Sequence, residues 1–597
     1  MRADMGLRAT TTGRQWTSVL TSSRWWISPL ILFLLVAFVY PVAQLLALSV
    51  LNKEGQLTLE HFTRFFATPV YLQVLGITLK VAFWTTLLCV LAGYPVAYLL
   101  ARVSPGTRGA LVLWILMPFW TSFLVRTFAW VVLLGRNGAI NSELSALGII
   151  DEPMELIYSF AGVMIGTTHA LLPMTVLTML GAMQTIDHNL TRAAGTLGAT
   201  PGQAFWRVWF PLSAPGVAAS ALLVFAVALG FFITPILLGS RKETMIAQLI
   251  LFQVEEVLNW HFAAAMSLVL LALTLALFYL YDRVVGISAL AGERRDEAGA
   301  KQGFFGRLAG RWSSRLFNAL GELSARAAAV KEQLLGSRAA SPRWLSPLWW
   351  FSIAAIAFLV VPTFFLVPVS FSTGEFIEWP PRGFSLRWYE EYFGSSVWRS
   401  ATMRSIWVAV ATAVASLALG IPAALTLSRP GLPARSAILA LIVSPLILPH
   451  IIVAIGLFYV YARVGLVGTS IGLVIGHTVF AVPYVVITMM AAMKHYDQRL
   501  DHAAWSLGAT RLQTVWKVTL PVLRAGVLAA FVFAFVRSFD ELTVALFIST
   551  GEATTLPKQM WSDALLKINP TLAAVSTCLL VFITLTIIAA DFLNRRR

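Results

Sequence analysis

Arg192-Ala-Ala-Gly-Thr-Leu-Gly198 and His502-Ala-Ala-Trp-Ser-Leu-Gly508 are two copies of one short motif, 310 positions apart in a chain of 597 residues. Each copy continues with alanine and threonine and is followed, thirteen residues after its last glycine, by Pro211 or Pro521. The paired alanines, the glycine and the proline predict a short helix, a bend and the start of a further helix. A repeat at this spacing indicates a duplicated domain.

The composition is that of a membrane protein. Apolar residues make up 58% of the chain and charged residues 12%, whereas soluble domains average about 25% charged residues. Apolar runs long enough to cross a bilayer core of about 30 Å recur throughout. We predict an all-α polytopic membrane protein with about 12 transmembrane helices. The predicted spans are 27–50, 74–101, 109–134, 156–183, 212–238 and 262–285 in the first half, and 346–371, 402–428, 435–462, 469–493, 522–548 and 569–590 in the second.

The internal repeat extends well beyond the motif. Leu59, Phe66, Gly93, Pro95 and Pro118 recur 327 positions later, and Gly166, Pro173, Gly216, Ala263 and Ala264 recur 310 positions later. The difference of 17 residues predicts an insertion in the first half, in the loop near 137–157. The repeat therefore divides the chain into an N-terminal segment 1–26, a first domain 27–285, a linker 286–345 and a second domain 346–597.

The distribution of charge predicts the orientation. The segments 1–26, 101–109 and 184–211 contain arginines and almost no acids, whereas the loop 135–157 has one arginine and four acids. The positive-inside rule then places both termini and both copies of the motif in the cytoplasm. Two six-helix halves that both start inside are parallel repeats about an axis along the membrane normal. The net charge of +16 reflects this topology and not nucleic-acid binding, because the basic residues form no groove interleaved with aromatics.

The linker contains apolar residues at helical spacing between 304 and 335, with arginines between them. This pattern predicts an amphipathic helix that lies on the lipid of the inner leaflet. A helical spacer without a specific target is the alternative. The apolar positions are Phe305, Leu308, Trp312, Leu316, Leu320, Leu323, Ala327, Val330 and Leu334.

The repeated motif resembles the "EAA" loop of ABC-importer permeases, in which Glu-Ala-Ala precedes a glycine by three residues and a Leu-Pro pair follows. This chain has Ala193-Ala194, Gly198 and Phe210-Pro211, and then Ala503-Ala504, Gly508 and Leu520-Pro521. The glutamate position holds Arg192 in one copy and His502, after Asp501, in the other. In the family this loop is a coupling helix seated in a groove of an ATPase subunit. The resemblance therefore implies a type I ABC-importer permease fold and two copies of an ATPase subunit as partners.

Four other stretches are similar to the permeases of spermidine/putrescine importers. Pro118-Phe-Trp-Thr-Ser-Phe-Leu-Val-Arg126 and Gly230-Phe-Phe-Ile-Thr-Pro-Ile-Leu-Leu-Gly239 resemble the first permease subunit, and Ser538-Phe-Asp-Glu-Leu-Thr-Val-Ala-Leu-Phe547 and Ile568-Asn-Pro-Thr-Leu-Ala-Ala-Val-Ser576 resemble the second. The resemblance implies both permeases fused in one chain of a bacterial inner membrane, served by a periplasmic solute-binding protein. It also implies a polyamine as solute, although relatives in this branch are associated with aminoethylphosphonate and ferric iron.

The sequence has no motif for nucleotide hydrolysis. Gly-x4-Gly-Lys-Ser/Thr does not occur, so ATP and its magnesium are expected on the partner subunits and no cofactor in this chain. The two cysteines, Cys89 and Cys578, provide no disulfide framework or metal site. A membrane enzyme is disfavoured because no catalytic constellation is present. An ion-coupled secondary transporter also fits parallel six-span repeats, but the duplicated turn argues against it.

Charged residues inside the predicted spans mark a candidate substrate path, because each is costly in lipid unless it is paired or faces water. Arg126, Arg537, Asp540 and Glu541 occupy positions where the other half has an uncharged residue. We predict that Asp540 and Glu541 bind a cationic solute or gate its passage. The alternative is a structural cluster, since Arg537 lies three and four residues before them and Arg126 is another possible partner. His450 follows Pro449 where the second permease often has glutamate, and it is either a path residue or a core histidine.

Overall fold

The computed structural model describes residues 23–284, 315–327, 329–330, 346–381, 383–429, 432–567 and 569–595. Residues 1–22 of the predicted N-terminal segment 1–26 lie outside these ranges. Of the predicted linker 286–345, only 315–327 and 329–330 are described, so the predicted helical positions Phe305, Leu308, Trp312 and Leu334 lie outside the described residues.

The first half is a series of long apolar helices with short helices between them. Its elements are η1 (Ser23–Ile27), α2 (Ser28–Leu34), η2 (Leu35–Val39), α3 (Tyr40–Ala47), η3 (Leu48–Val50), α4 (Glu60–Ala67), α5 (Pro69–Arg102), α6 (Pro105–Trp120), α7 (Phe123–Leu134), α8 (Ala139–Ala146), α9 (Phe160–Met183), α10 (Asn189–Thr196), α11 (Pro201–Ala204), η4 (Phe205–Trp209), α12 (Phe210–Leu229), α13 (Ile233–Leu238), η5 (Arg241–Glu243), α14 (Ile246–Glu255) and α15 (Trp260–Val284).

The second half repeats this order without a counterpart of α8. Its elements are α17 (Pro347–Val369), α18 (Arg387–Gly394), α19 (Ser396–Leu427), α20 (Arg435–Ile447), α21 (His450–Val464), α22 (Ser470–Met493), α23 (Arg499–Ser506), α24 (Arg511–Thr514), η8 (Val515–Thr519), α25 (Leu520–Val522), α26 (Arg524–Phe539), α27 (Thr543–Ile548), η9 (Gly551–Ala553), α28 (Leu556–Leu566) and α29 (Pro570–Arg595). The helix α8 lies in the predicted insertion near 137–157.

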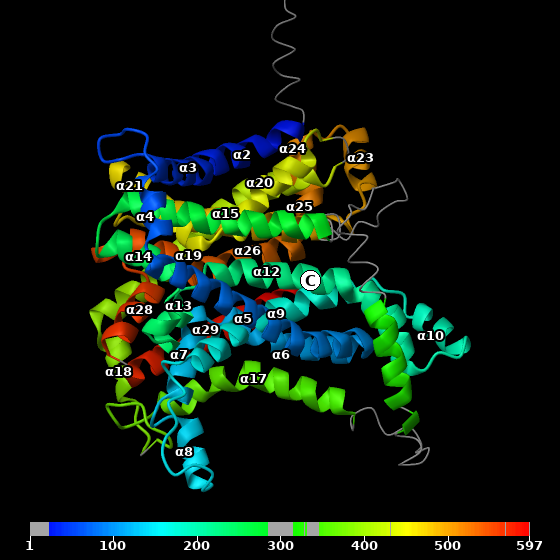
Figure 1. Ribbon diagram of the computed structural model, residues 1–597. Coiled ribbons are helices and arrows are strands. Elements are labelled where there is room, and N and C mark those ends of the chain that lie inside the picture. Colours follow the sequence, from blue (N-terminus) through cyan, green and yellow to red (C-terminus); the bar gives the residue numbers. More distant parts are fainter. Residues whose placement is uncertain are drawn as a thin grey trace, which may run out of the picture.

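The polytopic all-α architecture is confirmed. In the described part of the chain, nine helices are long and apolar enough to cross a membrane, and counting each of two bent helix pairs as one span raises the number to eleven. The last predicted span corresponds to α29, which has 26 residues. The long helices run roughly parallel (Figure 1). The helices α10 and α23 lie at one end of the bundle, hereafter the turn end, and α8, α18 and α28 lie at the opposite far end (Figure 1).

Four predicted spans, 109–134, 212–238, 435–462 and 522–548, are wrong as continuous helices. The third span of each half breaks, between α6 and α7 and between α20 and α21, and the latter pair meets at 95°. The fifth span of each half breaks as well, between α12 and α13 and between α26 and α27. Hydropathy averaged over a whole span does not detect these breaks, because the long apolar stretches on both sides outweigh the few polar or charged residues at a break, such as Asp540 and Glu541 between α26 and α27. Proline near the third-span breaks and Gly230 at one fifth-span break are the local signals that were present.

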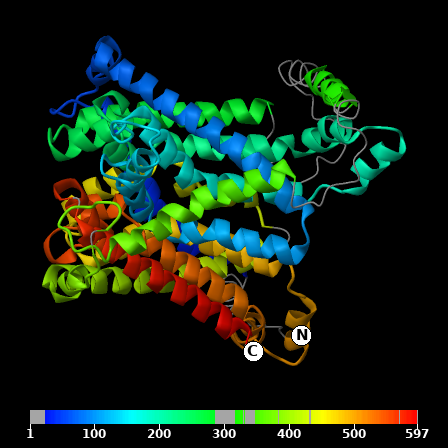
Figure 2. The same ribbon diagram turned by 90° about the horizontal axis from the view of Figure 1, so that it is seen from below.

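The first span of each half packs against the other half, which the sequence did not predict. The helix α3 lies beside α21, and α17 lies beside α5, α6 and α7 (Figures 1 and 2). Gly456 of α21 permits the first contact, because a Cβ atom there would lie 3.0 Å from the carbonyl oxygen of Pro41. His169 of α9 makes the second contact specific, since its Nε2 lies 2.9 Å from the carbonyl oxygen of Leu359 in α17. The two halves are therefore interlocked around a large hydrophobic core to which both contribute.

Candidate coupling turns and central junction

The two repeated turns fold alike. The helices α10 and α23 each have eight residues and end at a glycine in the left-handed region, Gly198 with φ +85° and Gly508 with φ +84°. The next backbone N–H, of Ala199 or Ala509, donates to the carbonyl oxygen of Ala194 or Ala504 at 3.0 Å. This is the glycine-terminated helix end in which a residue with a Cβ atom is strained. The glycine and the second alanine of the motif thus determine how each helix ends and in which direction the chain leaves it.

A second matched feature restarts the chain after each turn. Thr200 accepts a hydrogen bond from the Gln203 N–H, and the Gln203 side chain accepts one from the Thr200 N–H. Thr510 and Gln513 make the same reciprocal pair. Such a capping box fixes a helix start, so each turn is a rigid helix–bend–helix unit.

The two turns expose largely the same positions to solvent, although not always the same residue types. The predicted coupling residues Arg192, Ala193, Gly198, His502, Ala503 and Gly508 are exposed, Ala194 and Ala504 are half-buried, Pro211 lies half-buried in α12, and Pro521 is exposed in α25. Leu197 and Leu507, which occupy the same position in the two copies, are 89% and 88% exposed. One exposed leucine is ordinary, but here the same position is exposed at the tip of both turns, so both turns offer an apolar side chain at matched places.

The first turn is held against the bundle by aromatic stacking. Trp209 at the start of the fifth span is buried, and the His188 ring stacks on it with centroids 5.1 Å apart. The guanidinium carbon of Arg102, at the end of α5, lies 4.6 Å from the Tyr98 ring centroid and 5.9 Å from that of Trp209. These contacts combine apolar burial with a cation–π interaction.

The second turn is held at the matched place by a polar network. Arg429, the counterpart of Arg102, lies 3.4 Å from the carboxylate of Asp501, which is buried in α23. The hydroxyls of Tyr496 and Thr519 donate to the same carboxylate at 2.7 and 3.0 Å. Burial raises the pKa of the Tyr496 hydroxyl to about 12, so it keeps its proton and donates at physiological pH. Asp501, one residue before the expected glutamate, therefore anchors the turn from inside, a role that the sequence did not reveal.

We expect Asp501→Asn to loosen the second turn. The asparagine retains an acceptor for one hydroxyl but loses the charge that pairs with Arg429, and a hydrogen bond to a charged group contributes about 1.5–3 kcal/mol. Solute moved per ATP hydrolysed is expected to fall, and the purified chain to unfold at a lower temperature. Arg499→Gln on the same helix is the control, because its contact with Asp497 is fully on the surface. Unchanged coupling and unfolding in Asp501→Asn would contradict this role.

The breaks of the third and fifth spans meet between the halves, at a place hereafter called the central junction. The backbone N–H of Phe123, the first residue of α7, donates to the two carboxylate oxygens of Asp540 at 3.0 and 3.3 Å. On the other side, Gly230 packs on Pro449 so closely that a Cβ atom would lie 3.0 Å from the Pro449 Cβ atom. Asp540 and Gly230 are counterparts in the repeat. The break of a fifth span thus contacts the break of a third span in the other half at two matched places. A carboxylate, that of Asp540, lies at the N-terminus of a helix at one of these places, and Gly230 stands at the other.

Glu541 pairs with groups of its own half. Its carboxylate lies 2.7 Å from the Arg537 guanidinium and accepts the Val544 N–H at 3.1 Å, at the start of α27. Arg537 also lies over the Phe480 ring, with 5.8 Å to the centroid. Glu541 is 1% exposed. The ion pair that the sequence left as the alternative to a path role is therefore present for Glu541, and Asp540 is the carboxylate that faces the other half.

Arg126 and His450 lie next to the central junction. Arg126, in α7, is buried, donates to the Ala170 carbonyl oxygen at 3.2 Å and lies 5.2 Å from the Phe123 ring centroid. Its Nε has no hydrogen-bond partner among the described residues. The half-buried His450, the counterpart of Phe123, contacts the Phe480 ring edge to face at 4.8 Å.

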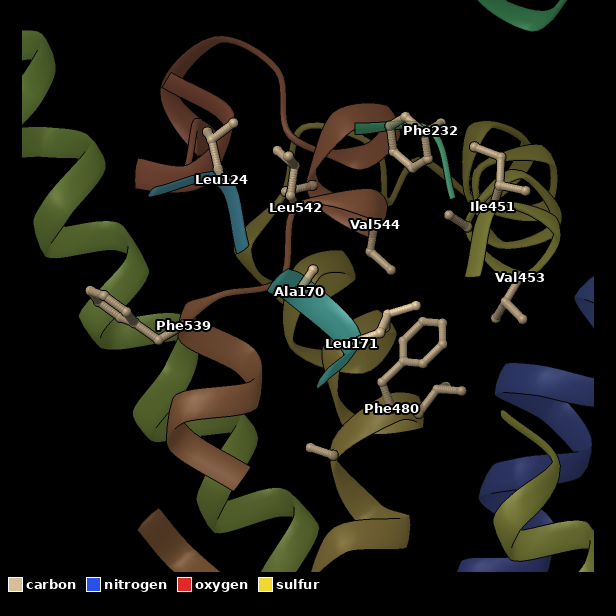
Figure 3. Close-up of a cluster of buried hydrophobic side chains, with 14 of the residues drawn as sticks. Leu124, Ala170, Leu171, Phe232, Ile451, Val453, Phe480, Phe539, Leu542 and Val544 are labelled. Atoms are coloured by element: carbon tan, nitrogen blue, oxygen red, sulfur yellow. The ribbon is translucent and has the colours of Figure 1, made fainter. Parts of the chain in front are cut away.

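Apolar side chains from both halves fill the space around these charges. Figure 3 shows them gathered from α7, α9, α21, α22, α26 and α27, with Leu124 and Ile451 among them, and from the residues just before α13 and α27, Phe232 and Leu542. Toward the far end, a cavity of about 830 Å³ lies between the halves, with Phe128 of α7, Leu237 of α13, Arg387 and Lys567 in its wall. Its volume is that of a site for a small molecule. An apolar closure thus lies between a far-end cavity and the two turns.

These features define a membrane permease in which one chain supplies two interlocked transport units. The chain belongs to the family of binding-protein-dependent transport system inner membrane components, which matches residues 93–288 and 416–597. It is a multi-pass inner-membrane protein and a transport subunit, not an enzyme. The predicted fusion of two permease units is confirmed.

Named relatives align with less than half of this chain at a time. The spermidine/putrescine transport system permease protein PotB of Haemophilus influenzae is 34% identical over 260 residues, 42% of this chain and 89% of the relative. The putrescine transport system permease protein PotI of Escherichia coli is 29% identical over 239 residues, 38% of this chain and 83% of the relative. A chain of a solved bacterial alginate ABC transporter aligns with 45% of this chain and 94% of its own length, at 19% identity and a TM-score of 0.39.

Proposed function

We propose that this permease imports a polyamine such as spermidine or putrescine, driven by two copies of an ATPase subunit that bind ATP and magnesium. One ATPase subunit sits on each coupling turn, and a periplasmic binding protein delivers the solute at the far end. The turn end and both termini are cytoplasmic, in keeping with the arginine-rich segments 101–109 and 184–211. The two transport domains are 27–285 and 346–597. The polyamine assignment draws on the names of the relatives.

The observation that carries the proposal is the Asp540 carboxylate at the central junction. In the closed arrangement this carboxylate accepts a hydrogen bond from the Phe123 N–H across the interface between the halves. When the ATPase subunits close, the two turns move and the halves separate at this contact. Asp540 then exchanges the backbone N–H for an ammonium group of the solute, a charge-assisted hydrogen bond of greater strength. Alternating access follows because the carboxylate binds either the other half or the solute.

A solute with a phosphonate group is the second candidate, and Arg126 favours it. This buried guanidinium donates one hydrogen bond to the Ala170 carbonyl oxygen, and its Nε has no hydrogen-bond partner among the described residues. Guanidinium groups bind phosphorus oxyanions in two-pronged fashion. Aminoethylphosphonate would place its phosphonate on Arg126 and its ammonium on Asp540, so the two solute classes differ in which residue they require.

Uptake in cells that carry or lack the gene tests the proposal. We expect uptake of labelled spermidine or putrescine at low micromolar concentration to depend on the gene and to stop on ATP depletion. Asp540→Asn is expected to lower it about 10- to 100-fold with normal protein abundance, because the asparagine still accepts the Phe123 N–H but loses about 1.5–3 kcal/mol of charged hydrogen bonding. Glu552→Gln, at an exposed far-end carboxylate, is the control.

Three results would overturn parts of this proposal. Uptake of aminoethylphosphonate, but not of polyamines, that is lost in Arg126→Gln would replace the polyamine by the second candidate. Uptake that survives ATP depletion while the proton gradient persists would indicate a secondary transporter. Wild-type polyamine uptake by Asp540→Asn at equal abundance would remove Asp540 from the path.

A further inference from the structure

The described part of the linker is a helix that packs on one of the two halves only. This linker helix comprises residues 315–327 and continues at 329–330. Glu322 lies 3.3 Å from the Arg207 guanidinium, and the Phe317 ring contacts Phe210 with centroids 5.1 Å apart. Gly202 makes the approach possible, because a Cβ atom there would lie 2.8 Å from that of Ser324. The linker helix therefore docks on the base of the first coupling turn.

The corresponding place in the second half is not built for such a contact. The counterpart of Gly202 is Leu512, which is 60% exposed and would obstruct a helix packed as closely. The linker helix is thus a feature of the first half, and it leaves a second surface of its own uncovered.

That second surface is an apolar stripe bordered by arginines. Leu316, Leu323 and Val330 are 57%, 65% and 53% exposed, and their spacing of seven places them on one side of the helix. Arg315 and Arg326 are exposed beside this stripe. The sequence from 304 to 345 has seven basic residues and two acidic ones. An apolar stripe flanked by arginines is the composition that binds an anionic lipid surface.

The position of the helix agrees with this surface. It runs across the direction of the spans at the turn end (Figure 1), and it lies at the side of the bundle in the second view (Figure 2). In both views α10 extends farther from the spans than the linker helix does. A partner seated on the tips of the turns therefore meets α10 first, whereas the linker helix lies near the ends of the spans, where the bilayer surface is.

We propose that the stripe of Leu316, Leu323 and Val330, with Arg315 and Arg326, binds anionic phospholipid headgroups of the cytoplasmic leaflet. The linker helix then ties the base of the first coupling turn to the membrane surface. The proposal rests on the proposed function only for the assignment of the turn end to the cytoplasm.

The test uses the full chain in nanodiscs of phosphatidylcholine alone or mixed with phosphatidylglycerol. An environment-sensitive fluorophore is attached to Leu323→Cys in a background with Cys89→Ala and Cys578→Ala, and to Asn318→Cys on the opposite, exposed side of the helix as a control. We expect a blue shift and quenching by lipid-borne spin labels at 323 in the mixed nanodiscs, with neither at 318. Adding Arg315→Gln and Arg326→Gln is expected to abolish the difference between the two lipids.

Two outcomes would overturn the proposal. One is equal quenching of both positions by aqueous iodide in both lipids. The other is protection of position 323 that arises only when the ATPase subunit is added, which would make that protein the occupant. Neither outcome bears on solute uptake, because the fluorescence is measured without solute or ATP. As a check that needs no cysteine background, purified wild-type protein is expected to retain more phosphatidylglycerol than the double glutamine variant.

Discussion

Substitution of both Gly198 and Gly508 by valine is expected to abolish solute uptake while the protein remains in the membrane. Both glycines have φ near +85°, and no neighbouring atom lies within 4 Å of the place where a Cβ atom would be. The effect of the valines is therefore backbone strain and not a clash. A left-handed conformation costs about 1–2 kcal/mol per residue with a side chain. Two turns together lose about 2–4 kcal/mol, which corresponds to a roughly 30- to 700-fold loss of the native conformation of the two turns.

The measurement is uptake together with the amount of ATPase subunit that copurifies with the permease, and both are expected to fall. Gly198→Asn with Gly508→Asn is the matched control, since asparagine tolerates the left-handed region, and it is expected to retain most uptake. Gly195→Ala, within α10 and with open space around its Cβ position, controls for added bulk. If the valine variant takes up solute like the wild type, the turns do not couple ATP hydrolysis to transport.

Loss of the folded protein is the expected result of Glu541→Gln. The substitution leaves the half-buried Arg537 guanidinium, inside the predicted eleventh span, without its counter-charge at 2.7 Å. Breaking one partner of a buried ion pair costs about 3–5 kcal/mol, a large part of the stability of a protein. We expect a strong fall in abundance, measured in membranes by immunoblotting, and early thermal unfolding of the remaining protein.

The double variant Arg537→Gln with Glu541→Gln separates stability from transport. It removes both charges, so abundance is expected to recover to near the wild-type level. Recovery of uptake as well would show that the pair is structural, as the contacts of Glu541 indicate. Normal abundance of the single Glu541→Gln variant would contradict the buried pair.

The repeat made much of the fold predictable. The matched offsets of 310 and 327 placed α8 in the insertion and both turns at the same end of the bundle. The breaks in the third and fifth spans were missed. The apolar composition continues through Gly230 and Leu448, and Asp540 and Glu541 at the break between α26 and α27 were read as charges inside a continuous helix. The exchange of first spans was also missed, since α3 and α17 are apolar on all sides and their sequence does not say which neighbour covers them.

The candidate sites were predictable to different degrees. Charges inside spans led to Asp540, Glu541, Arg537 and Arg126, yet only the structure separates Asp540, which faces the other half, from Glu541, which pairs within its own. Asp501 was not predicted as an anchor, because its partners Arg429 and Thr519 lie 72 and 18 residues away in the chain. The match of Arg102 with Arg429 at the ends of α5 and α19 was the available signal.

The two halves thus share the backbone geometry of their repeated turns and differ in the side chains that anchor these turns. Their turns end alike at Gly198 and Gly508. One turn is anchored by stacking on Trp209 and the other by the Asp501 network, and the central junction carries a carboxylate on one side only. A fused chain can keep such differences in fixed places, because its two halves cannot exchange positions.

Native mass spectrometry of the purified transporter tests most directly whether one chain supplies a whole transport pathway. We expect one copy of the 65.4 kDa chain with two ATPase subunits, and loss of both ATPase subunits in the double valine variant at Gly198 and Gly508. A complex of two permease chains, or one permease chain with a single ATPase subunit, would contradict the proposal that both halves of the pathway and both coupling turns reside in this chain.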